Sequence, residues 1–181
     1  MEIDDNKLIT VSRNCDATMI PAGEKIILIE GTHVRITQSL GGNFTVLVNG
    51  NLVKVSGKDA GALGLENEVK KNRKIPSRVA TEEDIWEAMK QCFDPEIPVN
   101  IVDLGLIYDI KIIGEKNKQD INIKMTLTAP GCGMGPSIAQ DVENKISVLN
   151  GVNNVDVQLV WEPQWDRDMM SEEAKLQLGM L

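Results

Sequence analysis

The alternation of hydrophobic and polar residues divides this chain into two parts with different expected structures. Residues 8–57 hold short apolar runs separated by turn signals, and these runs lie at residues 25–29, 33–37, 44–48 and 52–55. The last two runs flank Asn49 and Gly50. This pair favours a tight hairpin, because both turn positions adopt positive φ. We therefore predict a small β-barrel or β-sandwich of about five strands in the first part.

The second part shows helical and strand periodicities in turn. Apolar residues recur at helical spacing from residue 85 to Phe93, after a capping-box-like start at Thr81. Asp94 is expected to end this helix, because the residue before a proline avoids helical backbone. Two alternating strands follow near residues 106–112 and 121–127. A helix over 137–149 and a third strand, with Val155, Val157 and Leu159 facing inward, complete the series.

This order predicts an α+β or α/β fold, in which an α-β-β-α-β domain with a mixed sheet follows the small all-β unit. The last strand should run parallel to a neighbour, because a crossover helix precedes it. The stretch 66–80 is charged and weakly periodic, which is typical of a linker. The predicted boundaries are a β-rich unit at 1–65, a linker at 66–80, the α/β domain at 81–168 and a tail helix at 169–181, which Ser171 can cap.

Charge and composition narrow the possible functions. The net charge of −8 argues against binding to nucleic acid or to an anionic membrane surface. Aromatic residues make up only 3% of the chain, too few for base-stacking surfaces. Residues 1–80 carry 11 Lys and Arg against 9 Asp and Glu, whereas residues 81–181 carry 8 against 18, which supports two units. With no readable signal peptide or membrane-spanning run, we expect a cytoplasmic protein.

The three cysteines are widely spaced and form no CxxC pair, so neither a disulfide framework nor a closed zinc site is expected. Cys92 falls on an apolar helix face and is interpreted as core. Cys15 lies in a polar stretch, where an exposed, redox-active thiol or a second thiolate is the less favoured alternative. The single histidine, His33, belongs to the other unit and is interpreted as a strand-edge residue, so a Cys–His catalytic pair with Cys132 is not expected.

Cys132 is the strongest candidate for chemistry. It follows a strand and a Pro-Gly turn, and a helix is predicted to start directly after it. Free backbone N–H groups and the positive end of the helix dipole should stabilise a thiolate there, which would be reactive or able to bind metal. The alternative is a small buried residue, which the flanking glycines disfavour. Thiolates suit iron–sulfur clusters, zinc or copper(I), but one thiolate cannot complete a four-coordinate site.

Polar residues at the end of the first predicted helix, in the following loop and just before Cys132 are further candidates. Asp94, Glu96 and Asp103 could act as acid–base groups or as additional ligands. For Asp94 we favour turn formation, whereas for Glu96 and Asp103 both interpretations stay open. Thr128 could donate a hydrogen bond to the thiolate, and ordinary strand propensity is the alternative.

Three motifs carry a family resemblance over residues 81–168, and they read DPEIP at 94–98, VDLGLI at 102–107 and MTLTAPGC at 125–132. Together they resemble the metal–sulfur cluster biosynthesis domain of SufT, of PaaD-type oxygenase maturation factors and of the eukaryotic cytosolic iron–sulfur targeting subunit. The first unit resembles the N-terminal extension of long-form SufT proteins in the runs VSRNCDA at 11–17, IPAG at 20–23, VRITQSLGG at 34–42 and DAGALG at 59–64.

The resemblance implies an auxiliary, non-enzymatic factor that matures iron–sulfur proteins together with the SUF machinery and client apoproteins. It implies a homodimer whose reactive cysteine is Cys132 and whose acidic positions are Asp94, Glu96 and Asp103. An iron–sulfur cluster, or iron, would be bound transiently. Gly133 stands where many relatives have proline, which puts the ligand geometry in question. A thiol-dependent enzyme that uses Cys132 with Asp103 or Glu96, and an adaptor that binds no metal, remain as alternatives.

Overall fold

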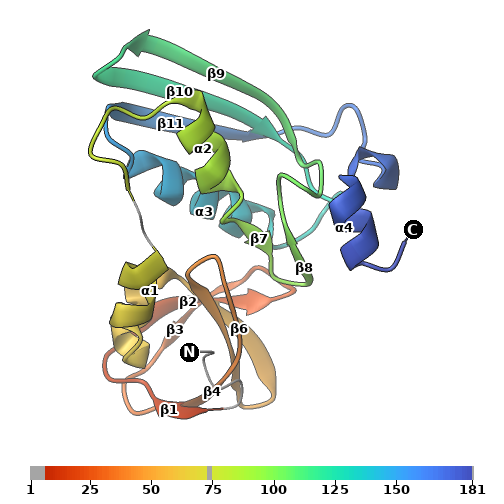
Figure 1. Cartoon of the computed structure of the whole chain (residues 1–181). Helices are drawn as coiled ribbons and strands as arrows, with labels where there is room; N and C mark the ends of the chain where they lie inside the picture. Colours follow the sequence, from red (N-terminus) through yellow and green to blue (C-terminus); the bar gives the residue numbers. More distant parts are fainter. Residues whose placement is uncertain (1–6, 73–74, 181) are drawn as a thin grey trace. The chain divides into compact units, whose positions relative to one another are not determined.

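A computed structural model describes residues 7–72 and 75–180 (Figure 1). The chain forms two compact units, Met1–Lys74 and Ile75–Leu181, and each is considered by itself. Residues 1–6, 73–74 and 181, which belong to the predicted first unit, linker and tail, lie outside the described residues. The division between the units falls within the segment 66–80, which the sequence predicts as a linker.

The first unit is a six-stranded antiparallel sheet with the strand order β1-β4-β5-β6-β2-β3. Its strands are β1 (Leu8–Thr10), β2 (Cys15–Ile20), β3 (Lys25–Leu28), β4 (His33–Leu40), β5 (Asn43–Val48) and β6 (Asn51–Val55). The hairpin between β5 and β6 turns through Asn49 and Gly50, whose φ angles are 48° and 81°. The predicted β-rich unit and its Asn-Gly hairpin are therefore confirmed, but the strands form one six-stranded sheet rather than a barrel or sandwich of about five.

Two short helices complete the core of this unit. Helix η1 (Gly57–Leu63) and helix α1 (Glu66–Asn72) follow the last strand. Val69 of α1 is only 8% exposed and belongs to the same hydrophobic cluster as Phe44 and Val46. The first half of the segment expected to be a linker is thus a helix of the first unit, because one buried valine attaches a mostly charged stretch to the core.

The second unit is built on a mixed three-stranded sheet with the order β11-β10-β9. Strand β9 (Ile107–Glu115) pairs antiparallel with β10 (Lys118–Met125), and β10 pairs parallel with β11 (Val152–Leu159). Helix α3 (Gly135–Ser147) forms the crossover, and it lies with α2 (Glu82–Met89) on one side of the sheet (Figure 1). The predicted mixed sheet and its parallel last strand are confirmed.

The end of α2 differs from the prediction. The helix stops at Met89, and the N–H of Cys92 then donates to the Met89 carbonyl at 2.9 Å in a tight turn. Phe93 and Asp94 form strand β7 (Phe93–Asp94), which pairs with β8 (Ile97–Asn100) in a short hairpin. The turn keeps Cys92 fully buried, as helical spacing would, while the extended backbone suits the residue before Pro95.

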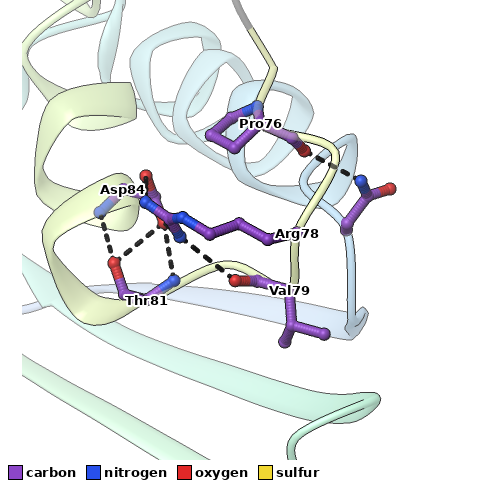
Figure 2. A network of polar contacts seen from close by, with 6 residues as sticks. Pro76, Arg78, Val79, Thr81 and Asp84 are labelled. Atoms are coloured by element: carbon purple, nitrogen blue, oxygen red, sulfur yellow. Dashed lines mark hydrogen bonds and ion pairs between the residues drawn. The ribbon is translucent and has the colours of Figure 1, made fainter.

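A polar network holds the segment before α2 on the second unit (Figure 2). The Thr81 side chain accepts from the N–H of Asp84, and the Asp84 carboxylate accepts from the N–H of Thr81 at 2.7 Å, which completes the predicted capping box. Arg78 pairs with the same carboxylate. The Asn150 amide donates to the Pro76 carbonyl at 2.8 Å, so the second half of the expected linker is attached to this unit.

Neutralising the Asp84 carboxylate is expected to weaken α2. Hydrogen bonds from Arg78 and Thr81 lower the pKa of Asp84 from 3.8 to about 2. The stabilisation is therefore complete above pH 4 and is lost as the pH falls toward 2. We expect Asp84→Asn to lower the free energy of unfolding at pH 7 by about 1 kcal/mol and to reduce the loss of stability between pH 4 and pH 2. Urea titrations at several pH values measure both effects.

Glu83→Gln removes a carboxylate from the same helical turn and serves as the control. A Glu83→Gln variant as unstable as Asp84→Asn would show that first-turn charge alone, rather than the capping network, stabilises α2.

Candidate functional site

Cys132 lies in the loop between β10 and α3, two residues before the N-cap residue Met134. Its side chain is partly exposed. The loop turns at Gly131, whose φ of +79° disfavours any residue with a side chain. The N–H of Cys132 donates to the Ala129 carbonyl at 3.3 Å, and the Cys132 carbonyl accepts from the N–H of Gly135 at 3.1 Å. The backbone therefore presents this thiol in a turn just before the helix.

Close packing fixes the C-terminal end of this loop. Met134 is fully buried. A β-carbon on Gly135 would lie 2.6 Å from Leu127 and 3.3 Å from Leu159, so the start of α3 packs directly against the ends of β10 and β11. At the N-terminal end of the loop, the N–H of Thr126 donates to the Leu106 carbonyl at 2.8 Å. Cys132 thus sits on a short loop that is anchored to the sheet on both sides.

Some backbone N–H groups at the helix start already have acceptors. The N–H of Gly135 bonds to Cys132, Pro136 has no N–H, and the N–H of Ile138 donates to Met134 at 2.9 Å. These donors are therefore not available to a thiolate at Cys132, and its stabilisation by the helix start stays a prediction. Thr126 is buried and Thr128 is half-buried, and the proposed hydrogen bond from Thr128 to the thiolate stays a prediction.

The acidic motif forms two turns. Asp94 is 4% exposed, and its carboxylate accepts from the N–H of Glu96 at 2.9 Å, which supports the favoured turn-forming role. Glu96 itself lies in the β7–β8 turn. Asp103 accepts from the side-chain amide of Asn100 at 2.6 Å, while the Asn100 side-chain carbonyl oxygen accepts from the N–H of Asp103 at 2.9 Å. Both aspartates therefore shape the backbone of the motif.

The C-terminal tail, residues 161–180, holds the Asp103 turn in place. It contains helices η2 (Arg167–Met169) and α4 (Glu172–Gln177), and α4 is capped by Ser171 as predicted. The N–H of Ser171 donates to the Asp103 carbonyl at 2.8 Å, and the indole N–H of Trp165 donates to the Leu104 carbonyl at 2.8 Å. Gln177 donates to the Pro98 carbonyl at 2.9 Å.

Sequence reasoning did not find this role of the tail. The available signal was Trp165, because a partly buried indole N–H needs an acceptor. A second signal was Gly105, whose φ of +72° lets the chain pass close to the Met169 carbonyl.

The predicted ligands do not form a metal-ligand group in the structure. Within residues 7–72 and 75–180, no three His, Cys, Asp or Glu side chains come together in a way that could hold a metal ion. The assignment of Cys132, Thr128, Asp94, Glu96 and Asp103 as cluster-binding residues stays a prediction.

The second unit also has a pocket of about 620 Å³, whose lining contains none of the predicted ligands. Its lining includes Tyr108 of β9, Lys124 of β10 and Pro163 and Met169 of the tail. The register of β9 and β10 shifts between Lys124 and Met125, beside Tyr108, and the Tyr108 hydroxyl donates to the Pro163 carbonyl at 2.8 Å.

The other two cysteines are buried, and the histidine is exposed on a strand of the first unit. Cys15 is 4% exposed in β2, so an exposed thiol at this position is excluded, and burial together with Asp59 raises its pKa. Cys92 is fully buried, as predicted. His33 is exposed at the start of β4, where its Nδ1 lies 3.0 Å from the Thr10 hydroxyl oxygen.

Thiol labelling should therefore detect one reactive cysteine in the folded protein. With an aromatic disulfide reagent, we expect Cys132 to react quickly, and Cys15 and Cys92 to react only after denaturation, because buried thiols are inaccessible. Absorbance of the released thiolate gives the count. Cys132→Ser should remove the fast phase completely, and a fast phase that persists in this variant would contradict the assignment.

Comparison with known proteins identifies the family of the second unit. The family model described as iron–sulfur cluster assembly protein matches residues 82–158. An Fe-S protein maturation auxiliary factor from Porphyromonas gingivalis is 46% identical over 101 residues, which cover 56% of this chain and 93% of that protein. The chain belongs to the iron–sulfur cluster assembly protein family.

The chain is also similar to a second relative and to a solved structure. The Fe-S protein maturation auxiliary factor SufT from Staphylococcus aureus is 39% identical over 87 residues, covering 48% of this chain and 96% of that protein. The crystal structure of a domain of unknown function from Bacillus anthracis has a TM-score of 0.50 at 38% identity, covering 55% of this chain and 92% of that one. Among the described residues, no helix is long and apolar enough to cross a membrane.

Proposed function

We propose that this protein is an auxiliary factor for the maturation of iron–sulfur proteins, in which Cys132 transiently binds iron or a cluster and passes it to client apoproteins. The observation that carries the proposal is a partly exposed thiol on a loop anchored to the sheet by Met134 and Gly135, in a chain of this family. The relatives named as maturation auxiliary factors support the same role.

One exposed thiolate suits transfer better than storage. When Cys132 coordinates iron, its thiol loses a proton and supplies a single ligand. The remaining coordination positions are left for sulfide or for groups of another chain. A client that offers several thiolates can then replace the one protein ligand, so the release of the cargo needs only one bond from this protein to break.

The further parts of the proposal concern how the protein works in the cell. It acts as a carrier rather than as an enzyme, in the cytoplasm, as a homodimer, and together with the SUF machinery. Asp94, Glu96 and Asp103 contribute to the proposed transfer by shaping the turns of the motif that precedes the Cys132 loop in the sequence.

Anaerobic reconstitution tests the proposal. Purified full-length protein is incubated with ferrous iron and sulfide, and iron, sulfide and visible absorbance are measured per chain. We expect the wild type and Cys15→Ala, which removes a buried thiol of the other unit, to bind iron, and Cys132→Ser to bind none. A wild type that binds no iron, or a Cys132→Ser variant that binds as much as the wild type, would overturn the carrier role.

A further inference from the structure

Strand β9 forms one edge of the three-stranded sheet and pairs only with β10 among the described strands. It is nine residues long. In an antiparallel ladder every second residue points its N–H and C=O away from its partner strand, so β9 offers a row of backbone groups to another strand. Ile113 on this strand is 52% exposed.

The charges on β9 are arranged in a self-complementary way. Asp109 and Lys111 point to the same face of the sheet, since they lie opposite Lys124 and Asn122 of β10. Their side chains are 44% and 63% exposed, and the ammonium nitrogen lies 3.9 Å from the carboxylate. Two opposite charges spaced two residues apart can pair with the same two residues of an identical antiparallel strand.

We infer that the edge of β9 pairs with β9 of a second copy of this chain, antiparallel and centred on Ile110. In an antiparallel pair, two facing residues both point their N–H and C=O groups toward the other strand or both point them away. Because these groups alternate along the strand, the two-fold axis must pass at a residue and not between two residues. A centre at Ile110 places Asp109 opposite Lys111 of the second copy, twice. The paired segment is residues 109–111, because the register shift beside Tyr108 turns Ile107 to the opposite face of the sheet from Ile113.

Other registers are less favourable. A centre at Asp109 or Lys111 places identical charges opposite each other, and a centre at Ile112 places Asp109 opposite Glu115. A centre at Ile113 pairs Lys111 with Glu115 but runs the ladder through Gly114, whose φ of +104° departs from extended backbone. The opposite edge of the sheet, β11, carries Asp156 as its only charged residue and offers no such pairs.

Charge reversal on the full-length protein tests this interface. In sedimentation equilibrium at low salt, we expect the wild type to dimerise. Asp109→Lys and Lys111→Glu should each weaken the dimer by at least about tenfold, because two attractive cross-strand pairs become repulsive. An equimolar mixture of the two variants should associate again, because both cross-strand pairs of the mixed dimer then join opposite charges. The double variant D109K/K111E should dimerise like the wild type, because its two charges are exchanged and still pair with each other across the interface. Lys116→Glu, in the adjacent turn, is the control for net charge.

Three results would overturn the interface: a monomeric wild type, single variants that dimerise normally, or a double variant that fails to associate. A dimer that responds to Lys111→Glu but not to Asp109→Lys would indicate the register centred on Ile113 and overturn the one inferred. The inference builds on the proposed homodimer, and the two can fail separately. If the protein dimerises but does not respond to any of these changes, the homodimer stands and this interface does not. Iron binding at Cys132 is measured separately and does not depend on either outcome.

Discussion

Cys132→Ser is expected to abolish the contribution of this protein to iron–sulfur maturation in cells, while the folded structure persists. A serine hydroxyl stays protonated at neutral pH and is a poor ligand for iron, whereas the thiolate is a strong one. The side chain is partly exposed and similar in size to serine, so stability should change by less than about 0.5 kcal/mol. The activity of a client iron–sulfur enzyme under iron limitation, in a strain that lacks this protein, measures the effect.

Cys15→Ala is the matched control, because Cys15 is buried in the first unit and has no role in the proposed transfer. It should retain maturation activity at equal protein levels. Full activity of Cys132→Ser would leave the adaptor alternative, in which the protein brings assembly machinery and clients together without binding metal.

The largest effect on stability is expected from Gly105→Ala. A β-carbon at this position would lie 2.2 Å from the carbonyl oxygen and 2.7 Å from the carbonyl carbon of Met169, and the φ of +72° adds strain for any residue with a side chain. The contact is with backbone, so the tail must move away. We expect the free energy of unfolding to fall by about 2–4 kcal/mol, from overpacking and backbone strain together. Urea denaturation followed by circular dichroism measures this change.

Gly179→Ala separates the two causes. Gly179 has nearly the same φ, +69°, but no atom lies within 4 Å of the position that a β-carbon would take, so only backbone strain of about 1 kcal/mol is expected. Displacement of the tail in Gly105→Ala should also break the bond from Trp165 to Leu104 and shift tryptophan emission to longer wavelength. Equal losses in the two variants would show that the contact with Met169 is not tight.

Local pattern was sufficient wherever one face of an element is buried or a turn needs a particular residue. The alternating strand at 121–127 appears as β10 with Ile121, Ile123 and Met125 buried. The positive φ angles at Asn49 and Gly50 agree with the predicted hairpin. Pattern was insufficient at the end of α2, because Cys92 is buried whether it continues a helix or follows a tight turn.

For the candidate site, the sequence by itself determined the family motifs, the position of Cys132 before a helix and the turn-forming role of Asp94. Only the tertiary structure decided that Cys15 is buried, that Val69 belongs to the first core and that the Asp103 carbonyl accepts from the distant tail. The physical reason is that burial and hydrogen bonding depend on residues far apart in the chain. The indole of Trp165 donates to a carbonyl 61 positions earlier in the sequence, and no local periodicity records such a contact.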